Sequence, residues 1–377
     1  MPDYLAPHLF QVKEMKPSIH PSLRYAEYAQ DCYNERVKSS LCSLLESYVF
    51  ATHDATWSKS CLIDSIHRLK RSTPELYFLH DRLQQAMRNQ NVADATTYVH
   101  RIADRANEFE ASFPYLSIDT ALKRNDHWEE FARGEAMLMT ERDFGRKSVF
   151  MRVSERALSE HIAHVATALS QIAMAFPEMH AEFSVHVRCI RLFDGAVTMG
   201  FTDERMFGAM LLRIPVSHIE PVSYYIEHIV HEASHIHLNA LMAVGKIILN
   251  DPGERFVSPI RPDPRPMLGV FHATYVTSRI VQALLKLLRW TKNENLLPSL
   301  AEAADELIRG YLEISRYGTF TEYGASLIRE LRDQIAGLTL LPEWRDFDFD
   351  TPRQHRYGSW KSNVAKLKEQ LESAQPA

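Results

Sequence analysis

The chain has 377 residues, of which 45% are hydrophobic and 24% are charged, and it contains only 13 glycines. This composition is typical of a globular protein that can bury a full core, and it excludes a disordered or fibrous chain. A formal net charge of -5 provides no basic field for nucleic acid, and no run approaches the roughly 18 apolar residues of a membrane span. We therefore expect a protein that binds neither nucleic acid nor a membrane.

The first residues and the cysteines suggest where the protein works. The N-terminus lacks the basic stretch and apolar run of a secretory signal, so we expect a cytoplasmic protein. The four cysteines show no pair at the spacing of a metal site, which predicts reduced thiols: Cys32, Cys42, Cys61 and Cys189.

The first third of the chain has a helical pattern, with apolar residues three and four apart from about residue 22 to 145. We expect helices at residues 37–51, 54–71 and 93–113, with breaks at Thr73-Pro74 and Phe113-Pro114. Residues 1–150 are therefore predicted to form a helical N-terminal extension. A long helical region of this kind is compatible with a homodimer.

A β region follows a further helix that is predicted at residues 154–176. Residues 182–192 alternate as a strand does, Asp194-Gly195 is a typical hairpin turn, and residues 196–201 and 209–214 are also strand-like. These features predict a small antiparallel sheet.

The last part of the chain is again helical. A long helix is predicted from Pro221 to about residue 249, and a proline-rich segment at residues 258–266 separates it from the next helix. Helices at residues 268–290, 300–316 and 323–336 precede a polar, aromatic tail. The expected fold class is α+β and mostly helical, with a catalytic domain at residues 151–345 and a tail at residues 346–377.

The helix that begins at Pro221 carries the sequence His231-Glu232-Ala-Ser-His235. Residues four apart project from the same face of a helix, so the two imidazoles can bind one metal ion. A histidine-rich helix without metal is the alternative, but the preceding strands and the surrounding apolar residues resemble a zincin-like metal helix. The sequence therefore predicts a metal site.

A catalytic metal site needs a third protein ligand and an open position. His272, which is flanked by apolar residues near the start of the next helix, is the stronger candidate; a core histidine without metal is the alternative. Glu254 is the second candidate, although it follows Pro-Gly in a loop. His228 shares a face with the motif and His237 does not, and packing or surface roles are favoured for both.

The proline-rich segment extends the pattern. The motif, then Ser-Pro-Ile-Arg-Pro-Asp-Pro-Arg-Pro, then Gly-Val-Phe-His272, together resemble the 2-oxoglutarate-dependent, HExxH-type peptide β-hydroxylases. These proteins act in the biosynthesis of ribosomally made, post-translationally modified peptides. The resemblance covers about residues 196–290, and it departs from the family pattern at Ile260, where the family usually has an aromatic residue.

The resemblance implies an Fe(II) ion held by His231, His235 and His272, with 2-oxoglutarate and O2 as cosubstrates and a precursor peptide as substrate. Three imidazoles suit iron or zinc equally, so the ligands alone do not choose the metal. The distal carboxylate of a 2-oxoacid needs a cation, best an arginine. Prolines hold Arg261 and Arg265 in a rigid, extended segment, although these arginines could instead form ion pairs with Asp263. Arg279 and Tyr275 lie on the face of His272 and could also reach the site, which makes Arg279 a third candidate for binding the 2-oxoacid, although an ordinary solvated or paired side chain is the favoured role for Arg279.

Glu232 has a different role in each possible activity. In a hydroxylase, iron and O2 oxidise a Cβ–H of the peptide, and Glu232 would orient substrate or a ligand imidazole. In a zinc metallopeptidase of the HExxH type, Glu232 would be the general base that activates a metal-bound water. The arginines are useful to a 2-oxoacid enzyme and unexpected in a peptidase, so we expect the hydroxylase. A metal-bound scaffold without turnover is a third possibility.

Overall fold

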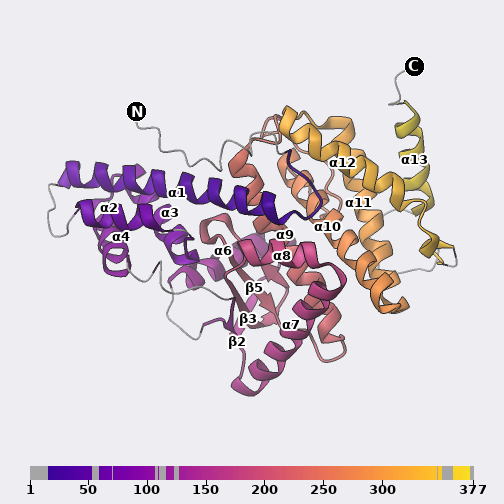
Figure 1. Cartoon of the computed structure of the whole chain (residues 1–377), viewed down its shortest axis with the longest axis horizontal. Coiled ribbons are helices and arrows are strands. Elements are labelled where there is room, and N and C mark those ends of the chain that lie inside the picture. Colours follow the sequence, from indigo (N-terminus) through magenta and orange to yellow (C-terminus); the bar gives the residue numbers. More distant parts are fainter. Residues whose placement is uncertain are drawn as a thin grey trace. The chain divides into compact units, whose positions relative to one another are not determined.

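The computed structural model describes residues 16–52, 59–69, 71–106, 109, 116–122, 127–345, 347–349 and 360–373. It is mostly helical with one small sheet, which confirms the coarse fold class (Figure 1). Two compact units are distinguished. The first comprises Met1–Tyr25, Leu169–Ala181 and Gly245–Ala377, and the second comprises Ala26–Ala168 and Glu182–Val244. The division into three consecutive domains, at 1–150, 151–345 and 346–377, stays a prediction.

Four helices lie at the start of the second unit, where the apolar periodicity predicts helical structure. They are α1 (Leu23–Thr52), α2 (Lys59–Arg68), α3 (Pro74–Arg88) and α4 (Val92–Arg105). Only three of these helices were named from the sequence, and α3 was not among them. The predicted break at Thr73-Pro74 is confirmed, because the Thr73 side chain accepts a hydrogen bond from the Leu76 amide and caps α3. The predicted break at Phe113-Pro114 lies outside the described residues.

The sheet of this unit has five strands in the order β1-β3-β5-β4, with β2 paired to β3. They are β1 (Ser117–Thr120), β2 (Val149–Arg152), β3 (Cys189–Ala196), β4 (Gly200–Phe201) and β5 (Ala209–Arg213). The prediction of an antiparallel sheet was wrong, because β3 runs parallel to both β1 and β5. Residues 189–193 of β3 are all buried, as expected of a parallel strand that is covered on both faces.

Two further details of the β region differ from the prediction. Residues 182–186 belong to helix α8 (Pro177–His186), so the strand begins only at Cys189. The pair Asp194-Gly195 lies inside β3, opposite Met151 and Phe150 of β2, and is not a hairpin turn. Gly195 is required there because a Cβ atom would collide with the Val149 carbonyl oxygen.

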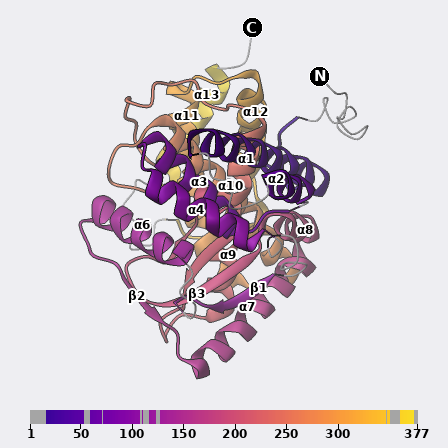
Figure 2. The same ribbon diagram turned by 90° about the vertical axis from the view of Figure 1, so that its left-hand side faces the viewer.

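Helices cover both sides of the sheet. A core of buried residues joins α1 to α4 and α6 (His127–Phe144) to one face, through Cys189, Phe193 and Leu211. Residues that alternate with these, Ile190, Leu192, Met210 and Leu212, are also buried and point to the other face. In Figure 2, α6 and α7 (Glu155–Ala175) lie on opposite sides of the sheet.

The remaining elements of the second unit lead to α9 (Pro221–Val244), which contacts β4 and β5. The predicted helix at residues 154–176 is confirmed by α7. The helix predicted from Pro221 is confirmed as well, although it ends at Val244, five residues earlier than expected.

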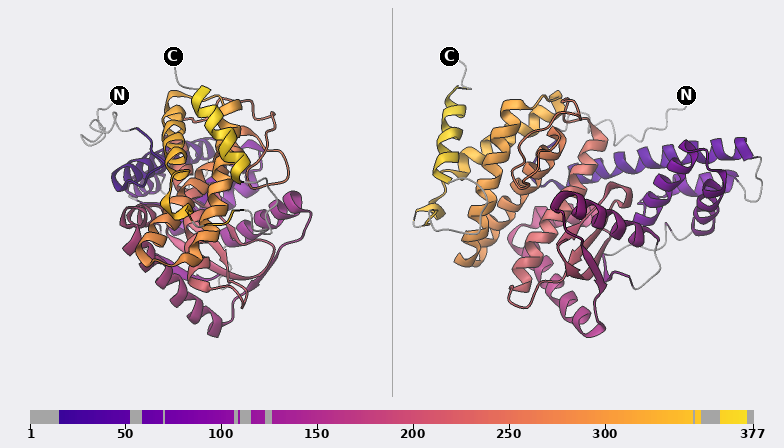
Figure 3. Two further views of the ribbon diagram at one scale, coloured as in Figure 1. Left: turned by 90° about the vertical axis from the view of Figure 1, so that its right-hand side faces the viewer. Right: turned by 180° about the vertical axis from the view of Figure 1, so that it is seen from behind.

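The first unit is a set of packed helices, drawn in orange to yellow in Figure 3. They are α10 (Met267–Thr291), α11 (Leu297–Tyr317), α12 (Glu322–Leu338) and α13 (Trp360–Ser373). The helices α10 and α11 approach closely at Gly310, where a Cβ atom would collide with the Thr274 side chain. The sequence did not predict α13, which lies in the expected tail. None of the described helices is both long and apolar enough to cross a membrane.

Candidate metal and anion site

The helix α9 holds the His-Glu-Ala-Ser-His sequence in its middle. Pro221 occupies the first helical turn, and the Glu220 carboxylate accepts hydrogen bonds from the Val222 amide at 3.0 Å and the Ser223 amide at 2.6 Å. An acceptor at this position satisfies amides that have no partner inside the helix. The helix therefore begins at a defined residue, which fixes the register of every side chain along it.

His231 and His235 lie together on one face of α9, as the sequence predicts. Their Nε2 atoms are 3.2 Å apart, and both side chains are half-buried. Nitrogens that each bind one ion at about 2.1 Å lie about 3 to 3.5 Å apart for common coordination angles. The pair can therefore bind one metal ion, although the same distance also fits a hydrogen bond between a protonated and an unprotonated ring.

Glu232 points away from the histidine pair and is buried against the edge of the sheet. Its Oε2 accepts a hydrogen bond of 2.9 Å from the Thr202 hydroxyl. Gly200 makes room for the carboxyl group, because a Cβ atom at that position would collide with Glu232 Oε1. Burial raises the pKa of Glu232 to about 8, against the opposing effect of the Thr202 hydrogen bond, so the carboxyl group keeps its proton at neutral pH.

The structure brings together two of the three predicted ligands. His272 lies on α10, in the other unit, and is half-buried; burial lowers its pKa to about 4, so its imidazole is neutral as a metal ligand must be. Glu254 is exposed in the same unit, 3.4 Å from the Asn250 side-chain amide. Within the part of the chain that the structure describes, no three His, Cys, Asp or Glu side chains are grouped as metal ligands.

The three predicted arginines contact other parts of their own unit. Arg265 Nε lies 2.8 Å from Asp263 Oδ2, which is the ion pair considered as the alternative role. Arg279 is buried and donates a hydrogen bond of 3.2 Å to the Ile19 carbonyl, and its guanidinium lies 5.8 Å from the Tyr275 ring centroid. Arg279 thus has the paired role that the sequence favoured.

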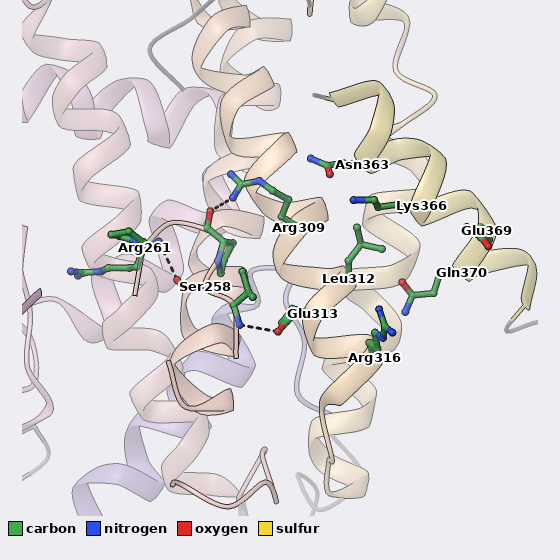
Figure 4. A pocket seen from close by; sticks show the side chains of 13 residues that line it. Ser258, Arg261, Arg309, Leu312, Glu313, Arg316, Asn363, Lys366, Glu369 and Gln370 are labelled. Carbon is green, nitrogen blue, oxygen red and sulfur yellow. Dashed lines mark hydrogen bonds between the residues drawn. The ribbon is translucent and has the colours of Figure 1, made fainter. Parts of the chain in front are cut away.

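Arg261 lies at the border of a groove of about 860 Å³ between the proline-rich segment, α11 and α13. Its backbone amide donates to the Ser258 hydroxyl at 3.2 Å. In Figure 4 its guanidinium extends away from Arg309 and Lys366, which line the groove from α11 and α13.

The two other histidines of α9 have different surroundings. His237 is buried, with Nδ1 2.8 Å from His186 Nε2 and Nε2 3.5 Å from Glu182 Oε2, so the packing role that the sequence favoured is confirmed. His228 packs edge-on against Tyr224, with ring centroids 4.1 Å apart. Burial lowers the pKa of His228 to about 3, and the electrostatic influence of the neighbouring His231 and Arg213 acts in the same direction.

Three residues around the motif were not predicted from the sequence. Thr202, Arg213 and Tyr224 lie near Glu232 or His228 because β4, β5 and the start of α9 meet there. One signal was available for Tyr224, which is four residues before His228 and seven before His231 and so shares their face. Thr202 and Arg213 are placed by strand pairing, for which the sequence offers no local signal.

Comparison with known proteins adds no assignment. A scan against models of protein families finds none that matches the chain, and a search of curated proteins finds no significant match.

Proposed function

We propose that the protein is an Fe(II)- and 2-oxoglutarate-dependent dioxygenase that β-hydroxylates a residue of a ribosomally made precursor peptide. The observation that carries the proposal is the His231–His235 pair, with Nε2 atoms 3.2 Å apart on a helix whose start is fixed by a cap. Neutral imidazoles at this separation are suitable ligands for a divalent transition metal. The resemblance of residues 196–290 to the peptide β-hydroxylases selects iron among these metals.

In this proposal His231 and His235 hold the metal, and the sequence resemblance supplies His272 as the third ligand. Bound iron and 2-oxoglutarate would supply the oxidising power that converts a Cβ–H bond of the peptide and O2 into an alcohol, with release of succinate and CO2. Burial keeps the imidazole of His272 neutral and ready to bind. The Thr202 hydroxyl and the absence of a side chain at Gly200 hold the Glu232 carboxyl group in one position at the edge of the sheet.

The peptide substrate fits the edge of the sheet. Among the described strands, β4 is at the end of the strand order and pairs on one side only, with β5. An extended peptide can add to such an edge through main-chain hydrogen bonds. The neighbouring Glu232 would then contact the peptide, which gives it an orienting role that does not require proton transfer.

The environment of Glu232 also bears on the alternative, a zinc metallopeptidase. A general base must be unprotonated, and burial raises the pKa of Glu232 to about 8. A metal ion nearby would lower this pKa again, so a peptidase needs the metal to activate its own base. A hydroxylase has no such requirement.

The experiment is anaerobic loading with Fe(II), followed by 2-oxoglutarate and a visible absorption spectrum. We expect a metal-to-ligand charge-transfer band that is lost in His231→Ala and His272→Ala. It should persist in His218→Ala, which removes an exposed histidine outside the site. Precursor peptides can then be screened for the gain of one oxygen atom by mass spectrometry.

Glu232→Gln separates the two activities. The hydroxylase predicts that this variant keeps the band, because the carboxyl group is not a ligand. If wild type forms no band, retains stoichiometric zinc, and cleaves peptides in a manner that Glu232→Gln abolishes, the protein is a peptidase.

A further inference from the structure

A group of polar side chains lies at the carboxyl end of β5, beside the histidine pair, and has no assigned role. We call it the Arg213 cluster, and it consists of Arg213, Tyr224, Tyr225, His228, His161 and His164. Arg213 is the last residue of β5, both tyrosines and His228 belong to the first two turns of α9, and the other two histidines belong to α7 (Figure 1).

The cluster forms one continuous series of contacts. Tyr224 packs edge-on against His228 at 4.1 Å and against Tyr225 at 5.6 Å between ring centroids. Tyr225 lies 5.9 Å from His161. The guanidinium of Arg213 is close enough to lower the pKa of Tyr224, although burial raises that pKa overall.

Several polar atoms of the cluster are buried without a partner among the described residues. They are Arg213 Nε, Tyr224 Oη, Tyr225 Oη, His161 Nδ1 and His164 Nδ1, and the Tyr225 side chain is completely buried. A buried polar group that forms no hydrogen bond costs about 1 to 3 kcal/mol in a protein. Five such atoms lie along one series of contacts, which continues from His161 to His164 at 5.6 Å between ring centroids, and a ligand bound there would satisfy them.

The chemistry of the cluster selects an anion. A guanidinium can only donate hydrogen bonds, and it is the side chain best suited to bind a carboxylate through two of them. The Glu220 carboxylate is engaged at the start of α9, where it accepts hydrogen bonds from the Val222 and Ser223 amides. Among the described residues the electrostatic partner found for the Arg213 side chain is the neutral Tyr224, which does not compensate its charge.

We propose that the Arg213 cluster binds a carboxylate group, with the Arg213 guanidinium as its cation and the Tyr225 hydroxyl as a further donor. This assignment depends on the contacts above. Its identification with the distal carboxylate of 2-oxoglutarate rests on the proposed function; a carboxylate of the peptide substrate is the other source. His228, which lies between Tyr224 and His231, would then separate the carboxylate from the metal.

Glutarate tests the carboxylate site, because it has two carboxylates and no keto group with which to chelate a metal. We expect isothermal titration of the full-length protein to show binding, and Arg213→Gln to weaken it about tenfold to a hundredfold, as loss of a charged hydrogen-bond donor implies. The matched control is Arg156→Gln, which removes an exposed arginine of α7. The proposal is overturned if wild type does not bind glutarate, or if both variants bind it equally well.

Tyr225→Phe is a second variant that does not threaten the fold, because it removes only a hydroxyl group without a protein partner. It should weaken glutarate binding about threefold to tenfold while the unfolding temperature stays the same or rises. An unchanged affinity would remove Tyr225 from the site.

A comparison of two 2-oxoacids identifies the source of the carboxylate. With Fe(II) present, Arg213→Gln should weaken the binding of 2-oxoglutarate, measured by titration of the charge-transfer band. The binding of pyruvate, which has no distal carboxylate, should be unchanged. If Arg261→Gln weakens the binding of 2-oxoglutarate and Arg213→Gln does not, the proline-rich segment binds the cosubstrate. The carboxylate at Arg213 then comes from the peptide. If wild type forms no band but glutarate binding still depends on Arg213, the proposed function fails and the carboxylate site stands.

Discussion

Buried polar residues on two sides of helix α9 differ in whether they have hydrogen-bond partners. On one side, His237 contacts His186 at 2.8 Å and Glu182 at 3.5 Å, and His186 continues to Gln30 at 3.0 Å. All four residues are buried and each has a partner. On the other side, Tyr225 and Arg213 carry buried polar atoms that the described residues leave without a hydrogen bond.

This difference distinguishes polar residues that stabilise the packing of α9 from polar residues that are available to a ligand. A buried polar network whose members are all hydrogen-bonded specifies how helices pack, and it leaves nothing for a ligand to satisfy. A group of buried polar atoms without hydrogen bonds lowers the free energy of unfolding of the free protein. A ligand that forms hydrogen bonds with these atoms raises it again. We therefore place the proposed function on the side with His228, His231 and His235.

The largest effect that tests this comparison is expected for His186→Phe. The imidazole of His186 connects His237 to Gln30, so its loss leaves two buried groups without their partner. We expect the free energy of unfolding to fall by about 2 to 4 kcal/mol, measured by chemical denaturation. The control His218→Phe changes an exposed histidine and should stay within about 0.5 kcal/mol of wild type. A similar loss in both variants would show that the network is not a stabilising feature.

The second largest loss of unfolding free energy is expected for Gly200→Ala, because the new side chain is too close to the buried carboxyl group of Glu232. The new Cβ atom collides with Oε1, and the displaced side chain loses its hydrogen bond with Thr202. We expect a loss of about 1 to 3 kcal/mol in unfolding free energy. Gly134→Ala is the matched control, since nothing lies within 4 Å of a Cβ atom there and alanine favours helix α6 by up to about 1 kcal/mol. If the two variants had the same unfolding free energy, Glu232 would be able to move away from the new side chain without loss of stability.

Much of this fold is predictable because helices are encoded locally. The periodicity that predicted α7, α10, α11 and α12 arises within each segment and needs no partner. The sheet could not be predicted in the same way. β1 and β3 are separated by about seventy residues, and a strand buried on both faces, as β3 is, lacks the alternation that distinguishes a half-exposed strand.

The candidate site shows the same limit. The spacing of His231 and His235 is a property of one helix, and the structure brings these two side chains together as predicted. Arg213 and Thr202 reach the same region only through the pairing of β4 and β5, so no sequence pattern could point to them. The arginines that the sequence did single out, Arg265 and Arg279, turn out to contact Asp263 and Ile19.

The smallest and sharpest test makes the same chemical change on both sides of α9. Tyr77 belongs to the satisfied network, where its hydroxyl lies in hydrogen-bond contact with Asn34 and Gln30, and burial raises its pKa. Tyr77→Phe should therefore cost about 1 to 2 kcal/mol of unfolding free energy. Tyr225→Phe should cost nothing, or should stabilise the free protein slightly, because the hydroxyl that it removes is buried without a protein partner. A saturating carboxylate ligand should narrow this difference, because it stabilises wild type and Tyr77→Phe fully but binds Tyr225→Phe about threefold to tenfold more weakly. If Tyr225→Phe destabilises the free protein as much as Tyr77→Phe does, the two sides of the helix are alike and the argument for a ligand at Arg213 is lost.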